Sequence, residues 1–140
     1  MYSVPEAINQ LVAAADKTAA TESLAVLDSL ERILAADICA AVAVPPADNS
    51  AMDGYAFCYA DAVANNFKLP LSQRIAAGTA PQVLAATTVA RIFTGAEIPP
   101  GADTVAMQEN CSEQNGLVEV DEGVKASANV RPRGQDIQAG

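Results

Sequence analysis

The stretch Pro45-Pro46-Ala47-Asp48-Asn49-Ser50-Ala51-Met52-Asp53-Gly54-Tyr55-Ala56-Phe57 places two carboxylates, an amide, a hydroxyl and a glycine between apolar segments. Its two prolines end the apolar run from Ile38 to Val44, which we expect to be a buried strand, because proline lacks the backbone donor that a sheet requires. The short polar side chains that follow favour a tight turn, and Gly54 can take a positive φ in a second turn. Such a loop is a common place for binding residues, although most turns of this composition are only structural.

Length and composition favour a small protein whose core is built from small side chains. The chain has 140 residues, of which 51% are hydrophobic, with three Phe, three Tyr and no Trp. This size suits one domain or two small subdomains. No apolar run is long enough to span a bilayer, and the first residues do not resemble a signal peptide, so we expect a soluble, cytoplasmic protein without a membrane partner.

Charge and residue types limit the chemistry of the chain. The formal net charge of −9 argues against binding to nucleic acid or to an anionic membrane. The absence of histidine excludes histidine-based zinc sites and Ser-His-Asp triads. Catalysis would therefore use carboxylates, hydroxyls, lysine or arginine, backbone amides, or a metal with oxygen ligands. A phosphorylated small molecule is still compatible with the acidic chain, because Mg²⁺ and a few donors reverse the field locally.

The three cysteines, Cys39, Cys58 and Cys111, show no C-x-x-C spacing. An odd number of cysteines without that spacing favours free thiols. Cys39 lies inside the apolar run before the prolines, so we expect it to be a buried free thiol.

Periodicity predicts helical structure near the N-terminal end. Ser3 and Glu6 have the spacing of a capping box, and apolar residues recur at helical spacing over residues 4–16. Residues 24–26 are compatible with a short strand. The following segment, Leu27 to Ala36, has a capping residue and a short apolar face, which predict a second helix.

From Leu69 onward, short apolar runs alternate with turn signals, which is typical of β structure. Asn115-Gly116 is a good signal for a two-residue hairpin, because both residues tolerate positive φ. We predict an α+β fold with short helices, an N-terminal α/β part and a β-rich, barrel-like second subdomain. The expected elements here are a helical turn over 61–66 and strands near 69–77, 88–93, 103–108 and 117–120. The expected domains are 1–44, a helical and linker part; 45–128, the β-rich subdomain; and 129–140, a return segment.

Two further polar loops carry groups suited to anions. In the loop Arg91 to Val105, a strand is expected to end at Phe93, and Thr94-Gly95 then offers a hydroxyl beside a backbone that a ligand can approach closely. The loop Asn129 to Asp136 holds two arginines, and the planar guanidinium suits phosphate or carboxylate. Each loop has a structural alternative: an ordinary turn for the first, and a solvated edge strand with a salt bridge for the second.

Four stretches of the sequence match one family in order and spacing. They are Asp48-Asn49-Ser50-Ala51-Met52-Asp53-Gly54-Tyr55-Ala56; Arg91-Ile92-Phe93-Thr94-Gly95-Ala96 with Pro100-Gly101-Ala102-Asp103; Asn129-Val130-Arg131 with Gly134-Gln135-Asp136; and the helix-like Leu27 to Asp37. With these stretches the chain resembles the molybdopterin molybdenumtransferase family, which includes the MoeA-type enzymes and the gephyrin E domain. The resemblance covers nearly the whole chain, and the nonapeptide that begins at Asp48 is its most specific part.

The resemblance implies a reaction. Enzymes of this family take adenylylated molybdopterin and molybdate, break the phosphoanhydride, release AMP and leave molybdenum on the dithiolene. The reaction depends on a divalent cation, usually Mg²⁺. Cleavage of a phosphoanhydride needs mainly positioning and charge neutralisation, which a cation held by carboxylates supplies, so this chemistry suits a chain without histidine.

The resemblance also implies site residues. Asp53, Thr94 and Asp136 match the functional residues of the family and are the expected catalytic residues, and Asp53 is also the candidate Mg²⁺ ligand. The expected substrate-binding residues are Ser50, Asn49 and Arg131. Gln135 stands where the family has a glutamate, which leaves the role of that charge open. For Asp48 and Asn49, a loop-shaping role through bonds to the backbone is the expected alternative.

The family architecture implies partners that this chain does not contain. Its enzymes are elongated homodimers whose cleft lies between the β-rich second domain of one subunit and the pterin-binding domain of the other. The chain resembles the N-terminal part only, so we expect it to be inactive alone, and we expect a molybdopterin adenylyltransferase to supply its substrate. The rival hypothesis is a non-catalytic scaffold or interaction module of the same fold, for which the apolar stripe of the first helix would provide a docking surface.

Overall fold

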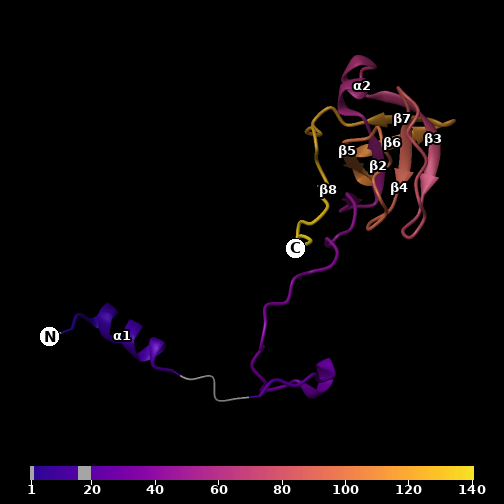
Figure 1. The fold of residues 1–140 in the computed structure, drawn as a ribbon. Helices are drawn as coiled ribbons and strands as arrows, with labels where there is room; N and C mark the ends of the chain where they lie inside the picture. The colour runs from indigo at the N-terminus through magenta and orange to yellow at the C-terminus, as the bar shows by residue number, and fades with distance from the viewer. Residues whose placement is uncertain (1, 16–19) are drawn as a thin grey trace. The chain divides into compact units, whose positions relative to one another are not determined.

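The computed structural model describes residues 2–15 and 20–140. These residues fall into two compact units, the first ending at Ile38 and the second running from Cys39 to Gly140 (Figure 1). No helix within the described residues is long and apolar enough to cross a membrane. The few helices and the mixed sheet confirm the predicted α+β fold class.

The first unit contains the predicted N-terminal helix. Helix α1 (Val4–Ala13) begins after Ser3, and the Glu6 carboxylate accepts hydrogen bonds from the backbone N–H and the hydroxyl of Ser3, at 2.7 and 2.8 Å. These bonds hold the first turn of the helix, as the capping-box spacing predicts. The helix ends three residues before the predicted end, and residue 16 lies outside the described residues.

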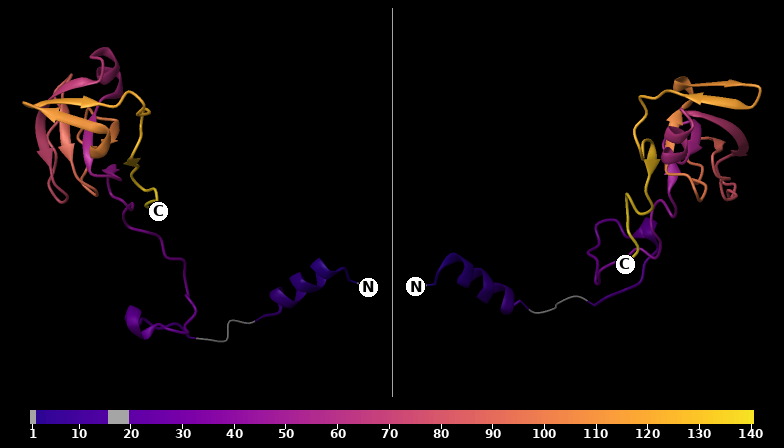
Figure 2. Two further views of the ribbon diagram at one scale, coloured as in Figure 1. Left: turned by 180° about the vertical axis from the view of Figure 1, so that it is seen from behind. Right: turned by 90° about the horizontal axis from the view of Figure 1, so that it is seen from above.

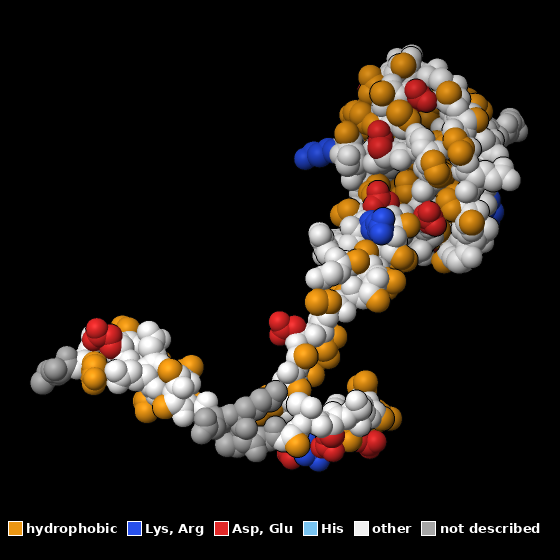
Figure 3. Space-filling view, in the orientation of Figure 1, with side chains coloured by type: hydrophobic (Ala, Val, Ile, Leu, Met, Phe, Trp, Pro, Cys, Tyr) orange, Lys and Arg blue, Asp and Glu red, His pale blue; other side chains and the backbone are white. Residues whose placement is uncertain are grey.

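The rest of the first unit differs from the prediction. Residues 24–26 form no strand, and in place of a helix over 27–36 there is one 3₁₀ turn, η1 (Val26–Asp28). The apolar side chains of this segment are exposed, with Ile33 at 96% and Leu27 at 94% (Figure 3). Most of the stability of a helix in a protein comes from packing of its apolar face. Because the apolar side chains of this segment are exposed, the segment does not form the predicted strand or helix.

The second unit is organised around a curled sheet that within the described residues has six strands (Figures 1 and 2). Their order is β5-β2-β4-β3-β7-β6, and every neighbouring pair is antiparallel except β3 and β4, which are parallel. The strands are β2 (Gly54–Phe57), β3 (Lys68–Ile75), β4 (Val89–Ile92), β5 (Thr104–Met107), β6 (Cys111–Gln114) and β7 (Leu117–Val120).

Smaller elements complete the second unit. Helix α2 (Tyr59–Ala64) confirms the helical turn expected near 61–66, and the 3₁₀ turn η2 (Gln108–Asn110) connects β5 to β6. Strands β1 (Asn49–Ser50) and β8 (Val130–Arg131) form a separate antiparallel pair. This pair joins the opening loop to the last part of the chain, so segments far apart in sequence meet beside the large sheet.

The large sheet buries side chains on both faces. Phe57 of β2 lies in a cluster with Leu69 and Val118, whereas Ala56, the residue before it, lies in a second cluster with Ile75 and Ile92. Successive residues of a strand point to opposite faces, so the alternation along β2 explains both clusters. A strand buried on both faces gives a fixed platform for the residues at its ends.

Apart from residues 24–26, most predicted β elements are confirmed, and one more is wrong. The four predicted strands correspond to β3, β4, β5 and β7, and Asn115 and Gly116 form the β6–β7 turn with φ of 53° and 77°. The sequence patterns did not identify β2 or β6 as strands. The predicted strand from Ile38 to Val44 is reduced to an isolated bridge, in which the Val44 N–H donates to the Ile137 carbonyl at 2.8 Å.

The cysteines of the described residues are free, as predicted, but Cys39 is exposed and not buried. Its segment forms no strand, so the apolar run around it is not covered by the sheet. Cys111 is the more protected thiol, and burial raises the pKa of Cys111 to about 11.

Candidate functional site

The three polar loops identified in the sequence meet at one end of the second unit. Ser50 donates its N–H to the Ala96 carbonyl at 2.9 Å and accepts the Gly95 N–H at 2.8 Å, which joins the first loop to the second. In the β1–β8 pair, Asn49 lies opposite Arg131, which joins the first loop to the third. The convergence follows from backbone pairing, so it is part of the fold.

The centre of the site is the contact between Asp53 and Thr94. The Asp53 Oδ1 atom accepts hydrogen bonds from the Thr94 N–H at 2.8 Å and from the Thr94 hydroxyl at 2.7 Å. These two bonds lower the pKa of Asp53 below its usual value. Desolvation opposes them, and the positive charge of Arg91 adds the smallest lowering effect. Asp53 is therefore a carboxylate at neutral pH.

The strands explain why these two residues meet. Asp53 precedes β2, and Thr94 follows β4 by two residues. Strands β2 and β4 are antiparallel, with Gly54 opposite Ile92, so the start of one lies beside the end of the other. The β2–β4 pairing therefore brings the backbones of Asp53 and Thr94 close together, and only their short side chains remain to be oriented.

Gly54 is required here for a different reason from the one the sequence suggests. The sequence favours a turn with positive φ, but Gly54 lies in β2 and is not among the glycines with positive φ. A Cβ atom on Gly54 would overlap the carbonyl oxygen of Ala106 and lie 3.2 Å from the Cα of Met107. Glycine at this position permits the close approach of β2 and β5.

The third loop contains an ion pair. Arg131 donates from Nη2 to Asp136 Oδ2 at 2.7 Å and from Nε to Gln135 Oε1 at 3.3 Å. Both partners of the ion pair are about half exposed, so solvent weakens it. Within the described residues, no hydrogen bond joins Asp136 to Asp53 or Thr94. The catalytic role of Asp136 therefore stays a prediction.

Ser50 and Asp48 are occupied by bonds to the backbone. The Ser50 hydroxyl donates to the Met52 carbonyl at 2.6 Å, and Ser50 is only 1% exposed. The Asp48 Oδ1 atom accepts the Arg133 N–H at 2.7 Å. The loop-shaping bond expected of Asp48 is thus present, although its partner is in the third loop. For Ser50, the structure provides a loop-shaping contact, and substrate binding stays a prediction.

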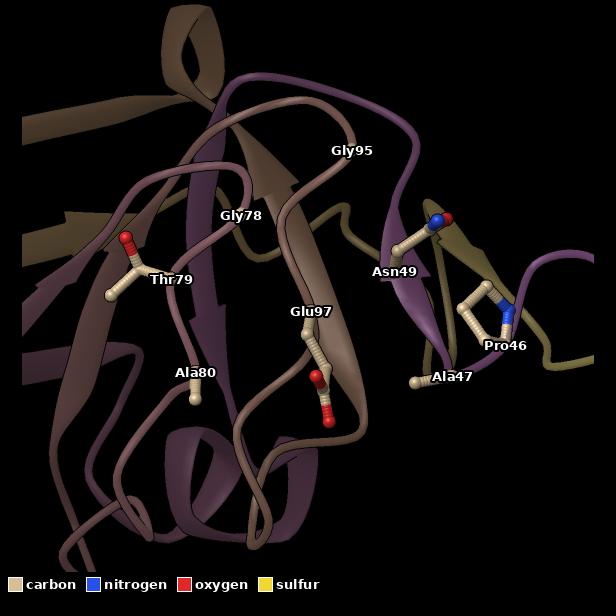
Figure 4. Close-up of a pocket in the computed structure, with 8 residues that line it drawn as sticks. All are labelled: Pro46, Ala47, Asn49, Gly78, Thr79, Ala80, Gly95 and Glu97. Carbon is tan, nitrogen blue, oxygen red and sulfur yellow. The ribbon is translucent and has the colours of Figure 1, made fainter.

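A cavity of about 340 Å³ opens beside this site. Figure 4 shows the Gly78-Thr79-Ala80 turn on one side and Pro46, Ala47 and Asn49 on the other, with Gly95 and Glu97 between them. The Oδ1 atom of Asn49 is buried and has no hydrogen-bond partner among the described residues. An unpaired buried acceptor is costly, so this atom would gain from a ligand or water with a donor group.

The described residues suit a metal ion that takes few protein ligands. They contain no group of three or more Cys, Asp or Glu residues that could enclose a metal. The Asp53 Oδ2 atom makes no hydrogen bond in this part of the chain, whereas Oδ1 is bonded to Thr94. Mg²⁺ commonly takes one or two carboxylates and completes its shell with water and substrate phosphate, so Asp53 fits as a single ligand.

Two residues near Asp53 were not identified by sequence reasoning. Arg91 donates to the Gly54 carbonyl at 2.7 Å, and Gln108 donates its backbone N–H to the Asp53 carbonyl at 3.0 Å. Arg91 lies in a stretch that matches the family, but nothing in its local pattern indicated a contact with the first loop. The β2–β4 register supplies that contact.

Comparisons with known proteins agree on one family. The family model described as MoeA N-terminal region (domain I and II) matches residues 2–140. The molybdopterin molybdenumtransferase of Nostoc sp. (strain PCC 7120) is 38% identical over 148 residues, which cover 100% of this chain and 34% of that protein. The protein of the same name from Haemophilus influenzae is 37% identical over 122 residues, which cover 86% of this chain and 30% of that protein.

The fold has solved counterparts. A crystal structure of the molybdopterin biosynthesis MoeA protein from Pyrococcus horikoshii matches with a TM-score of 0.75 and 30% sequence identity. The match covers 84% of this chain and 31% of that chain. The present chain spans about a third of the length of the curated relatives it matches.

Proposed function

The chain belongs to the MoeA N-terminal family, and on that premise we propose that it forms one wall of the site at which a molybdopterin molybdenumtransferase inserts molybdenum. The substrates would be adenylylated molybdopterin and molybdate, and the released product would be AMP. The observation that carries the proposal is the Asp53–Thr94 contact, in which a carboxylate and a hydroxyl are fixed together at an exposed loop.

The contact assigns different roles to the two side chains. Because Thr94 donates its hydroxyl proton to Asp53, its oxygen lone pairs are left to accept a hydrogen bond from a water molecule. Asp53 remains ionised, and its Oδ2 atom is free to face a cation. A bound Mg²⁺ would neutralise phosphate charge as the phosphoanhydride breaks. Asp53 and Thr94 would then hold the cation and orient water.

The rest of the machinery is also proposed. Residues 45–128 would provide this wall, with Asn49 toward the substrate. Arg131 of the return segment would also face the substrate, and Asp136 would complete the third loop. The opposite wall would come from a pterin-binding domain, and the working form would be a cytoplasmic homodimer that receives its substrate from a molybdopterin adenylyltransferase.

The direct test is AMP release by the full-length protein that carries this region. We expect Asp53→Asn to reduce the rate by about a hundredfold or more, because the amide cannot neutralise a cation or developing charge. Glu122→Gln is the matched control, since Glu122 is exposed and makes no described hydrogen bond. Its rate should equal that of the unchanged protein. Unchanged AMP release by Asp53→Asn would remove the proposed role of Asp53.

A second candidate function is a scaffold that binds a partner without chemistry. The observation that favours it is the exposed apolar side chains of the first unit, including Leu27, Leu30 and Ile33. Under this reading, the Asp53 and Glu122 variants would behave alike in every assay. Full-length protein that releases no AMP from adenylylated molybdopterin, with Mg²⁺ and molybdate present, would support the scaffold.

A further inference from the structure

We propose that Arg91 is a positioning residue, which holds the backbone on which Asp53 is mounted so that the carboxylate stays against Thr94. This inference rests on the proposed function in that it takes Asp53 as the functional carboxylate. The way in which Arg91 holds the Asp53 loop does not itself depend on any reaction.

The hydrogen bonds of Arg91 converge on the peptide groups next to Asp53. Its Nη1 atom donates to the Gly54 carbonyl at 2.7 Å, and its Nη2 atom donates to Gln108 Oε1 at 2.6 Å. Gln108 in turn donates its backbone N–H to the Asp53 carbonyl at 3.0 Å. Two consecutive carbonyl groups are therefore held by two residues that are also bonded to each other.

The Arg91 guanidinium is itself fixed in place. Its central carbon lies 4.7 Å from the centroid of the Phe93 ring and 5.2 Å from that of Tyr55, and the residue is half-buried. Stacking on aromatic rings and bonds to backbone carbonyls favour arginine over lysine, because only the planar guanidinium makes both contacts at once. All of these contacts are with other groups of the protein. Arg91 would therefore act on Asp53 by holding the loop that carries it.

Electrostatics agrees with the geometry. The positive charge of Arg91 lowers the pKa of Asp53, as a smaller effect than the N–H and hydroxyl bonds from Thr94. Those two larger bonds depend on the position of the Asp53 backbone, whose carbonyl and that of Gly54 are bonded by Gln108 and Arg91. Loss of the network should therefore weaken the Thr94 bonds as well as the direct attraction between charges.

Arg74 provides a matched control. It lies opposite Arg91 in the parallel register of β3 and β4, and its guanidinium lies 4.6 Å from the same Phe93 ring. Unlike Arg91, it makes no hydrogen bond to the Asp53 loop within the described residues. A variant of Arg74 removes a neighbouring positive charge and an aromatic contact while leaving the network intact.

The test is an NMR experiment on the 140-residue chain with Arg91→Lys, Arg91→Gln and Arg74→Gln. It measures the pKa of the Asp53 carboxyl carbon by titration and the exchange rate of the Thr94 amide. Both Arg91 variants should raise the pKa of Asp53 and speed Thr94 exchange about tenfold. The Leu71 amide, which donates to Gly116, should keep its rate and so exclude general unfolding. Arg74→Gln should leave both measurements unchanged.

Two results would overturn the inference. One is a pKa and an exchange rate in Arg91→Gln that equal those of the unchanged chain. The other is recovery of both values in Arg91→Lys, because positive charge alone would then be sufficient. If Arg91 variants do not fold, Gln108→Ala, at an exposed side chain, should shift both values in the same direction, and no shift would reject the network.

The design separates this inference from the proposed function. The NMR measurements need no turnover, so they report on the position of Asp53 whether or not it is catalytic. Conversely, unchanged AMP release by Asp53→Asn would remove the proposed function and leave the measured role of Arg91 intact.

Discussion

Asp53 is held as a carboxylate by one residue that donates to it twice. The Thr94 N–H and hydroxyl both reach Oδ1, so the carboxylate plane is set by a backbone position as well as by a side chain. A group that is fixed before the substrate binds loses little conformational entropy during the reaction. In the proposed function, the Asp53–Thr94 pair would meet a cation or water on its open side.

The residue scale also contains the sharpest steric requirement in the site. A Cβ atom at Gly54 would overlap a backbone oxygen of β5, and the backbone of a paired strand cannot move aside as a long side chain can. This requirement lies next to Asp53, so stability and site geometry depend on the same glycine.

We predict that Gly54→Ala destabilises the chain by about 3 kcal/mol, because overpacking against backbone forces the strands apart. Chemical denaturation of the variant and of the unchanged chain measures the difference. Gly123→Ala is the matched control, since its φ is not positive and the nearest atoms to a new Cβ belong to the Asp121 side chain. The control should change stability by less than about 1 kcal/mol. Equal stability of both variants would contradict the steric account.

The family resemblance selected residues that meet in the structure, but the sequence did not show why they meet. The family match selected Asp53 and Thr94, and the structure places them in contact. Gly54 was expected in a turn, because its strand-packing role depends on Ala106, which is distant in sequence. Arg91 was not identified for the same reason: its partners become neighbours only through the strand register.

At the scale of elements, short pairings between loops bring the site together. Strands β1 and β8 have two residues each, yet they join the first loop to the third. The Asp48 carboxylate adds one more hydrogen bond between the first and third loops by accepting the Arg133 N–H. Because so few bonds are involved, the last part of the chain should open locally at a modest cost compared with the large sheet.

We predict that Asp48→Ala loosens the third loop without unfolding the sheet. The Arg133 amide should exchange with solvent about fivefold faster, the equivalent of roughly 1 kcal/mol for one lost hydrogen bond. Hydrogen exchange followed by NMR measures this, with the Leu71 amide of β3 as internal reference. Asp37→Ala, at an exposed position with no described hydrogen bond, is the control variant. Equal Arg133 exchange in both variants would show that Asp48 does not hold the loop.

Element prediction succeeded where packing partners lie within the second unit. The alternating pattern of β3 and the Asn115-Gly116 turn both find their partners in the sheet. The predictions for residues 24–36 and for the strand before Pro45 were wrong. Most of their apolar side chains are exposed, and periodicity alone does not hold a short element together. Strand β6, with mostly exposed residues, gave little hydrophobic signal.

At the scale of the whole molecule, the second unit has its own core and carries all the candidate site residues. No described residue of the first unit is buried, and its large apolar side chains are exposed to solvent. The chain also spans about a third of its curated relatives. In the proposed function the site is composite, and this chain provides one half of it.

The measurement that tests this claim most directly is AMP release from adenylylated molybdopterin in the presence of Mg²⁺ and molybdate. The 140-residue chain is mixed with the separately made remainder of a full-length relative. We predict release from the mixture, none above background from either part alone, and a rate at least about a hundredfold lower when the chain carries Asp53→Asn. Release by either part alone at the rate of the mixture, or a mixture that is unaffected by Asp53→Asn, would contradict the account.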